Sequence, residues 1–157
     1  MSAPIAPKTP TRAETCNCQA IRAAARHVTQ FYDQSLAPSG LRTSQFTILA
    51  KLKRNGPLTI NALADDMAID RTTLGRNILP LQRDGLISIE ASAADRRAKE
   101  LVLTKAGEKR LRAAAKLWFA AQARFDTVFG GKRAAVLRAL MATVVASDFA
   151  GLRDPSS

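Results

Sequence analysis

The sequence is poor in the residue types that most often serve in catalysis and metal binding. Its 157 residues include one histidine and two cysteines, and aromatic side chains make up only 5%. It contains no Ser-His-Asp order, glycine-rich phosphate loop or carboxylate pair with metal-ligand spacing. Two cysteines and one histidine are also too few for a closed tetrahedral metal site. We therefore expect no enzyme activity, no cofactor and no metal.

The sequence also lacks any long apolar segment. No run approaches the roughly 20 residues that a helix needs to span a bilayer, and residues 1–12 contain no apolar stretch of the signal-peptide type. The two cysteines do not form a disulfide framework. We expect a cytoplasmic protein with no membrane partner.

Alanine and positive charge are what the chain has in excess. Hydrophobic residues make up 46%, and with so few aromatics the core must consist of Ala, Leu, Ile and Val. Because alanine is the best helix former, this composition favours a mostly α-helical fold. The 24 Lys and Arg against 13 Asp and Glu give a net charge of +11. Such an excess indicates a polyanionic partner, usually nucleic acid, with a membrane surface as the alternative; solubility alone needs only about 2–8 charges.

Apolar periodicity predicts four longer helices. Apolar residues recur at spacings of three and four over residues 15–36, and Ala37-Pro38-Ser39-Gly40 ends that helix. A second helix is predicted over residues 44–54. A long helix over 104–129 and a last one over 133–149 are separated by Gly130-Gly131.

Between these helices lie the signals of a helix-turn-helix. Thr59 and Asp70 are both good N-cap residues, and each is flanked by the apolar pair of a hydrophobic staple. Two helix starts eleven residues apart leave room only for a tight turn. The pattern therefore predicts helices over 59–66 and 70–84 joined by residues 67–69.

A small β-hairpin is predicted directly after this motif. Gly85 ends the second helix, residues 86–90 read as a strand, and residues 100–103 read as its return. A hairpin in this position is a wing. Pro80 predicts that the preceding helix either kinks there or ends earlier, because proline removes a helical hydrogen bond.

The predicted fold is thus mostly α, a winged helix-turn-helix domain with a β-hairpin wing and flanking dimerisation helices. Residues 43–103 form the DNA-binding domain, and residues 15–42 with 104–150 form the helical dimerisation region. Residues 1–14 are a flexible basic arm, and residues 151–157 a polar tail. The terminal helices carry apolar stripes without an obvious partner in so small a chain, which favours a homodimer over packing on their own domain.

Candidate DNA contacts follow from how such a motif docks. The first residues of the recognition helix read base edges in the major groove, and Gly75 would let the backbone approach closely. Arginine pairs with guanine, and threonine contacts phosphate or a thymine methyl. A wing-tip arginine can enter the minor groove, with Asp95 pairing with an arginine to hold the loop. The candidates are Arg71, Thr72, Thr73, Arg76, Asp95, Arg96, Arg97 and Lys99.

Six short motifs follow one another along the chain, and their order and spacing are specific together. They are Gln45-Phe46-x-x-Leu49, Leu58-Thr59-x-x-x-Leu63-Ala64, Asp70-x-Thr72-Thr73, Leu81-x-x-x-Gly85-Leu86-Ile87, Asp95-Arg96-Arg97 and Leu103-Thr104-x-x-Gly107. Together, over residues 20–149, they resemble the MarR family of bacterial regulators. The resemblance implies a symmetric dimer on a pseudo-palindromic operator, usually as a repressor. It also implies that a small, often aromatic effector binds between the dimerisation helices and the winged domain and releases the DNA. On that pattern Asp95 and Arg97 match the family's wing pair.

The effector site is only loosely indicated by the sequence. The side chains that could line it are His27, Phe31, Tyr32, Trp118 and Phe119, although aromatic residues at helical spacing are more often part of a core. His27, beside Arg26, fits a surface or interface position better than a metal site.

Two alternative hypotheses retain the same fold but differ in what controls DNA binding. In the first, Cys16 and Cys18 make the protein a redox-sensing regulator. A bond between them would require local unwinding, and cysteines in such a position are more often structural or inert. In the second, the chain is an architectural DNA-binding protein without an effector, which predicts little sequence discrimination and a steep salt dependence.

Overall fold

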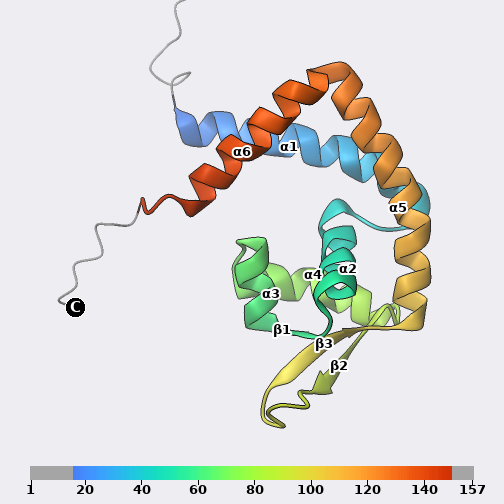
Figure 1. The fold of residues 1–157 in the computed structure, drawn as a ribbon. Helices are drawn as coiled ribbons and strands as arrows, with labels where there is room; N and C mark the ends of the chain where they lie inside the picture. Colours follow the sequence, from blue (N-terminus) through green and yellow to red (C-terminus); the bar gives the residue numbers. More distant parts are fainter. Residues whose placement is uncertain (1–15, 150–157) are drawn as a thin grey trace, which may run out of the picture.

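The computed structural model describes residues 16–149, which form six α-helices and a small sheet (Figure 1). The predicted arm and tail lie outside these residues. Helix α5 runs between the hairpin at one end of the molecule and helices α1 and α6 at the other (Figure 1). The elements are α1 (Asn17–Leu36), a 3-10 turn (Ala37–Ser39), α2 (Thr43–Asn55), β1 (Leu58–Thr59), α3 (Ile60–Met67), α4 (Arg71–Arg83), β2 (Ile87–Ala91), β3 (Lys99–Leu103), α5 (Lys105–Phe125), a π-helical turn (Asp126–Gly130) and α6 (Gly131–Ala146).

Three predicted helix caps are confirmed. The side chains of Thr59, Asp70 and Thr104 each accept a hydrogen bond from the backbone N–H three residues later, at 3.1, 2.8 and 3.0 Å. Each bond satisfies one of the free N–H groups of a first helical turn. These caps fix where α3, α4 and α5 begin, and so confirm the helix-turn-helix.

The wing is confirmed, with one strand more than predicted. β2 and β3 pair antiparallel from Ile87–Leu103 to Ala91–Lys99. The two-residue strand β1 adds to the other side of β3, so the sheet order is β1-β3-β2. Two residues are too few to show an alternating pattern, which is why β1 escaped prediction.

Helix α4 continues through Pro80 to Arg83, so the expectation that it ends earlier was wrong. Burial of Ile78 and Leu81 on either side of the proline anchors this last stretch to the core. Gly85 follows the end of the helix, as predicted, and its φ of 68° suits glycine.

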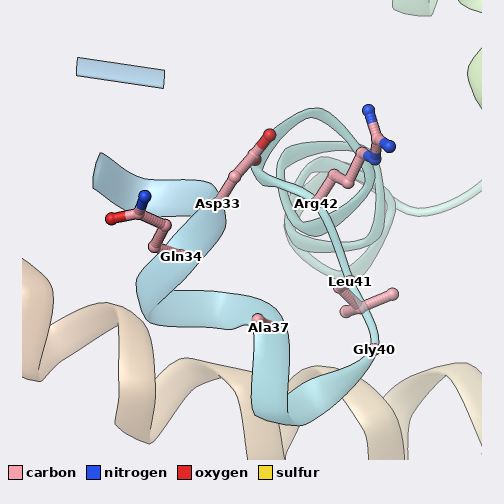
Figure 2. A pocket seen from close by; sticks show the side chains of 6 residues that line it. All are labelled: Asp33, Gln34, Ala37, Gly40, Leu41 and Arg42. Carbon is pink, nitrogen blue, oxygen red and sulfur yellow. The ribbon is translucent and has the colours of Figure 1, made fainter. Parts of the chain in front are cut away.

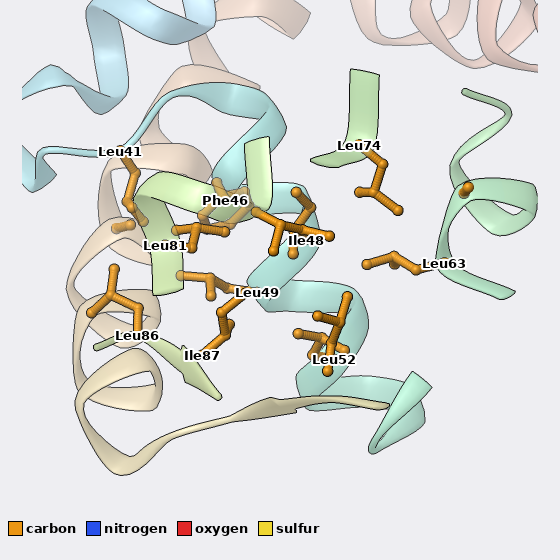
Figure 3. Packing of buried hydrophobic residues seen from close by; sticks show 14 of the residues in the cluster. Leu41, Phe46, Ile48, Leu49, Leu52, Leu63, Leu74, Leu81, Leu86 and Ile87 are labelled. Atoms are coloured by element: carbon orange, nitrogen blue, oxygen red, sulfur yellow. The ribbon is translucent and has the colours of Figure 1, made fainter. Parts of the chain in front are cut away.

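The core lies within the winged-helix unit and receives contributions from α1 and α5 (Figure 3). Leu36 of α1 and Ala114 of α5 are fully buried in the same cluster. The rings of Phe46 and Trp118 also stack across α2 and α5, with centroids 5.7 Å apart. The core cluster therefore includes residues of α1 and α5 that lie outside residues 43–103. The central members of the core cluster are Ile48, Leu49, Leu52, Leu63, Leu74, Ile78, Leu81, Leu86, Ile87 and Leu101.

The terminal helices bury little of their apolar surface within the protomer. Leu36 is the one buried residue of α1, and Ala134 the one buried residue of α6. On α6, Val136, Leu140 and Val145 are 59%, 56% and 69% exposed. The apolar face of α6 is thus largely uncovered in the described part of the chain, whereas Phe31 and Tyr32 of α1 lie against Phe125 of α5.

Candidate nucleic-acid interface

The first half of α4 presents a basic surface to solvent. Its apolar residues Leu74, Ile78 and Leu81 point into the core, while Arg71 and Arg76 are exposed. Within residues 16–149, neither guanidinium group has an ion-pair partner. Both are therefore available to acceptors on bases or phosphates.

Gly75 leaves an open space on the same helix. A Cβ atom built on Gly75 meets no atom of the protein within 4 Å. The space adjoins the exposed Arg76, so a flat partner could approach the helix backbone there.

The N-cap residue of α4, Asp70, makes two hydrogen bonds that fix the first turn of the helix. The Asp70 carboxylate accepts the Thr73 N–H at 2.8 Å and the Thr73 hydroxyl at 2.6 Å. These bonds favour the charged carboxylate and lower the pKa of Asp70, the hydroxyl bond having the largest effect. Because the Thr73 hydroxyl proton is already donated, the predicted contact of Thr73 with a phosphate would need this bond to break. The neighbouring Thr72 is exposed.

The wing tip is ordered by backbone contacts rather than by an ion pair. The Asp95 carboxylate accepts the backbone N–H of Arg97 at 2.9 Å, and the Asp95 carbonyl accepts the Ala98 N–H at 2.9 Å. The buried Ser92 closes the loop, since its N–H donates to the Ala98 carbonyl. The expected pairing of Asp95 with an arginine side chain is therefore wrong, although Asp95 does hold the loop.

This arrangement leaves the wing cations exposed. The side chains of Arg96, Arg97 and Lys99 are solvent-accessible, and none of them forms an ion pair in the described residues. Ion pairs do form at Lys51–Asp66 and Lys53–Glu108, each at 2.7 Å, and at the far end of α4, where Arg83 binds Asp84 at 3.1 Å. Four unneutralised arginines thus occupy the two elements that the sequence singled out.

Comparisons with known proteins agree with this arrangement. The model of the MarR family matches residues 41–99. The crystal structure of the Mycobacterium tuberculosis transcriptional regulator MosR is similar over 85% of this chain and 98% of that chain, with 34% identity and a TM-score of 0.72. The chain belongs to the MarR family. Membership confirms the winged helix-turn-helix fold and a transcriptional regulator rather than an enzyme.

A second structure of MosR and one further relative were also found. MosR in complex with DNA is 36% identical to this MarR-family chain, over 83% of this chain and 98% of that one, with a TM-score of 0.69. The HTH-type regulator YwoH of Bacillus subtilis is 31% identical over 90 residues. That match covers 57% of this chain and 65% of YwoH, which is just under two thirds of its length.

The five aromatic and histidine candidates for an effector site fall into separate groups in this MarR-family fold. Phe31 and Tyr32 of α1 lie with Phe125 of α5, at centroid distances of 6.4 and 6.3 Å. The Tyr32 hydroxyl donates to the side chain of Gln122, and burial, with a smaller effect of the Asp126 charge, raises the Tyr32 pKa.

The other candidates lie apart from this group. Trp118 packs between Phe46 and Phe119, with the Phe119 ring centroid 5.0 Å away and its side chain 65% exposed. His27 is exposed on α1. Whether any of the five binds an effector remains a prediction.

Two surface hollows of the regulator escaped sequence analysis. One, of about 490 Å³, lies where α1 turns into α2 (Figure 2), and it is lined by Asp33, Gln34, Ala37, Gly40, Leu41 and Arg42. The other, of about 400 Å³ and almost wholly apolar, lies on α6, and it is lined by Phe129, Lys132, Arg133, Val136, Leu137 and Leu140. Neither hollow includes a predicted effector residue. The first hollow has one local feature, the positive φ of Gly40, which turns the chain at that point.

Cys16 and Cys18 are free and exposed at the start of α1. Cys16 is the N-cap residue of that helix and Cys18 lies within its first turn. Among residues 16–149 no group of three or more potential metal ligands comes together. No helix in this part of the chain has the length and apolar character required to cross a membrane.

Proposed function

We propose that this MarR-family regulator binds a specific DNA duplex as a homodimer and acts as a repressor. The observation that carries the proposal is the set of four unneutralised arginines, Arg71 and Arg76 on α4 and Arg96 and Arg97 on the wing. In winged helix-turn-helix proteins the recognition helix enters the major groove, and narrow minor grooves attract arginine. That MosR has been crystallised with DNA supports this assignment.

The unburied apolar surface around α6 supports the proposed dimer. Val136, Leu140 and Val145 of α6 and Val128 before it are all more than half exposed. Each such side chain gains roughly 1.5–3 kcal/mol when it is fully buried. A second copy of the chain would bury these stripes and place two recognition helices on half-sites about 34 Å apart, one turn of the duplex.

A charge on α6 tests the dimer. Leu140→Asp should convert a dimer to a monomer, measured by light scattering, because burying an unpaired carboxylate in the interface is costly. Lys132→Ala, at the rim of the same hollow, serves as the control and should remain dimeric. A monomeric wild-type protein at micromolar concentration would refute this part of the proposal.

DNA release would arise from a population shift. An effector that prefers one arrangement of the dimer moves the two recognition helices away from the spacing of the operator half-sites. We propose a small aromatic effector, since Phe31 and Tyr32 of α1 gather with Phe125 of α5 into an aromatic cluster within the helical region. The exposure of Cys16 and Cys18 favours a second candidate switch, thiol oxidation. An oxidant response that survives replacement of both cysteines by serine would eliminate it.

The deciding experiment compares binding to the intergenic DNA beside the protein's own gene with binding to random DNA of equal length. At physiological salt we expect the intergenic DNA to bind about a thousandfold tighter or more. Arg76→Ala should lose about 1–3 kcal/mol of discrimination, and Arg97→Ala should weaken operator binding with the fold intact. Arg83→Ala, on the same helix but ion-paired with Asp84, is the control. Equal affinity for both DNAs, lost steeply with salt, would instead indicate an architectural protein.

A further inference from the structure

A direct side-chain contact joins the recognition helix to α2. The Ser44 hydroxyl, in the first turn of α2, donates to the Asn77 Oδ1 at 2.7 Å. Asn77 lies in the middle of α4, and its Nδ2 donates to the Thr73 carbonyl at 2.9 Å. The half-buried Asn77 amide therefore binds α2 through its oxygen and the preceding turn of its own helix through its nitrogen.

The turn of α2 that carries Ser44 is itself fixed to α1. The Asp33 carboxylate of α1 accepts the Thr43 N–H at 2.7 Å. Asp33 also lines the hollow at the turn from α1 to α2 (Figure 2). Hydrogen bonds thus connect α1, the first turn of α2 and the middle of α4.

The connection continues to the end of α4 that carries the exposed arginines. Thr73, whose carbonyl Asn77 holds, binds the Asp70 cap through both its N–H and its hydroxyl. The residues between the cap and Asn77 include Arg71 and Arg76. Hydrogen bonds therefore hold the segment that would face DNA at both of its ends, at Asp70 and at Asn77.

Hydrogen bonds constrain α4 in a way that its apolar contacts do not. The buried Leu74 and Ile78 hold the helix against the core, but apolar contacts are non-directional and tolerate small rotations. A hydroxyl–amide bond weakens steeply when its angle changes. Bidentate pairing of arginine with a guanine edge needs a correctly oriented helix.

We infer that Ser44 and Asn77 are positioning residues that set the orientation of the recognition helix and so its sequence discrimination. Asn77 acts through the helix rather than on a base, because its oxygen and one amide hydrogen are already engaged. The inference rests on the proposed function, since it presumes that α4 reads DNA.

The test measures the ratio of affinities for the intergenic DNA and for random DNA of equal length. Asn77→Ala and Ser44→Ala should each lower this ratio roughly two- to tenfold, the range for losing one net hydrogen bond. Affinity for random DNA and its salt dependence should not change, because no phosphate contact is removed. Ser44→Thr keeps the hydroxyl donor and should keep the ratio. The double variant should be no worse than the more affected single variant, because the Ser44–Asn77 bond is already lost in each of them.

The outcomes separate the inference from its premise. A wild-type protein without discrimination overturns the proposed function itself. If the wild type discriminates and both alanine variants keep its ratio, only the positioning role is overturned. Equal losses of affinity for both DNAs also overturn the positioning role, since general damage to the fold lowers all binding. Thermal unfolding of each variant identifies such damage. Ser44→Ala repeats the test from the α2 side.

Discussion

Gly107 is the position where the structure leaves least room for a side chain. It is buried in the first turn of α5, and a Cβ there would lie 2.1 Å from the Leu86 carbonyl oxygen and 2.7 Å from a methyl group of Leu103. The Leu86 oxygen cannot easily move away, because it accepts hydrogen bonds from both the N–H and the hydroxyl of Thr104. Gly107→Ala must therefore displace α5 from the start of the wing.

The expected cost follows from two opposing effects. Overfilling a packed site costs about 1–3 kcal/mol, and a contact with fixed backbone belongs at the upper end of this range. Replacing glycine by alanine in a helix regains up to about 1 kcal/mol. We expect Gly107→Ala to lower the free energy of unfolding by roughly 2 kcal/mol, which for a chain of this size lowers Tm by about 4–8 °C.

Gly75 provides the matched control on another helix. Alanine there meets no protein atom within 4 Å, so only the gain in helix propensity remains. We expect Gly75→Ala to raise Tm by about 2–4 °C, while weakening operator binding if the backbone approaches DNA at this point. The opposite signs distinguish packing from a general effect of adding a methyl group.

The assay is thermal unfolding followed by circular dichroism, at one fixed protein concentration because Tm of an oligomer depends on it. A Gly107→Ala protein that melts within about 1 °C of wild type would refute the packing argument. So would a Gly75→Ala protein that melts lower than wild type.

Two further predictions concern the helix caps. Thr104→Ala removes the cap of α5 and the hydroxyl's bond to the Gly85 carbonyl, and should cost about 1–2 kcal/mol in thermal melts, whereas Thr104→Ser should stay close to wild type. The Asp70 cap should be sensitive to acid: because its folded pKa lies below the unfolded value, its stabilisation is complete above the unfolded pKa and is lost as pH falls through the folded one. The difference in Tm between wild type and Asp70→Ala should therefore shrink between pH 7 and about pH 3; a constant difference would contradict the role of the charged carboxylate.

Local signals in the sequence predicted the parts of this fold that depend on local physics. Thr59, Asp70 and Thr104 were identified as caps because a capping bond spans only three residues. The exposure of Arg71 and Arg76 followed from their place opposite the apolar face of α4. Of the two outcomes that Pro80 allowed, a kink or an early end, the early end does not occur, because burial of Ile78 and Leu81 outweighs one lost hydrogen bond.

What escaped prediction depends on contacts between distant segments. Strand β1 exists only because Leu58 lies beside Leu101, and the Ser44–Asn77 bond joins residues 33 positions apart. Asp95 was expected to bind a side chain, but a turn brings the Arg97 N–H closer. Such pairings depend on how the backbone folds in three dimensions, so they cannot be predicted from residue spacing along the chain.

The uneven burial described above also determines which backbone amides are protected from solvent exchange. Opening of a segment requires less free energy where few apolar contacts hold it. Amides of α2 and β3, around Leu49 and Leu101, should exchange only on global unfolding, because both side chains are fully buried. Those of α6 should exchange through local opening in a single protomer and, if the proposed dimer covers Leu140, become slow on assembly. Hydrogen exchange along α6, followed during dilution, would then report what fraction of the regulator is assembled.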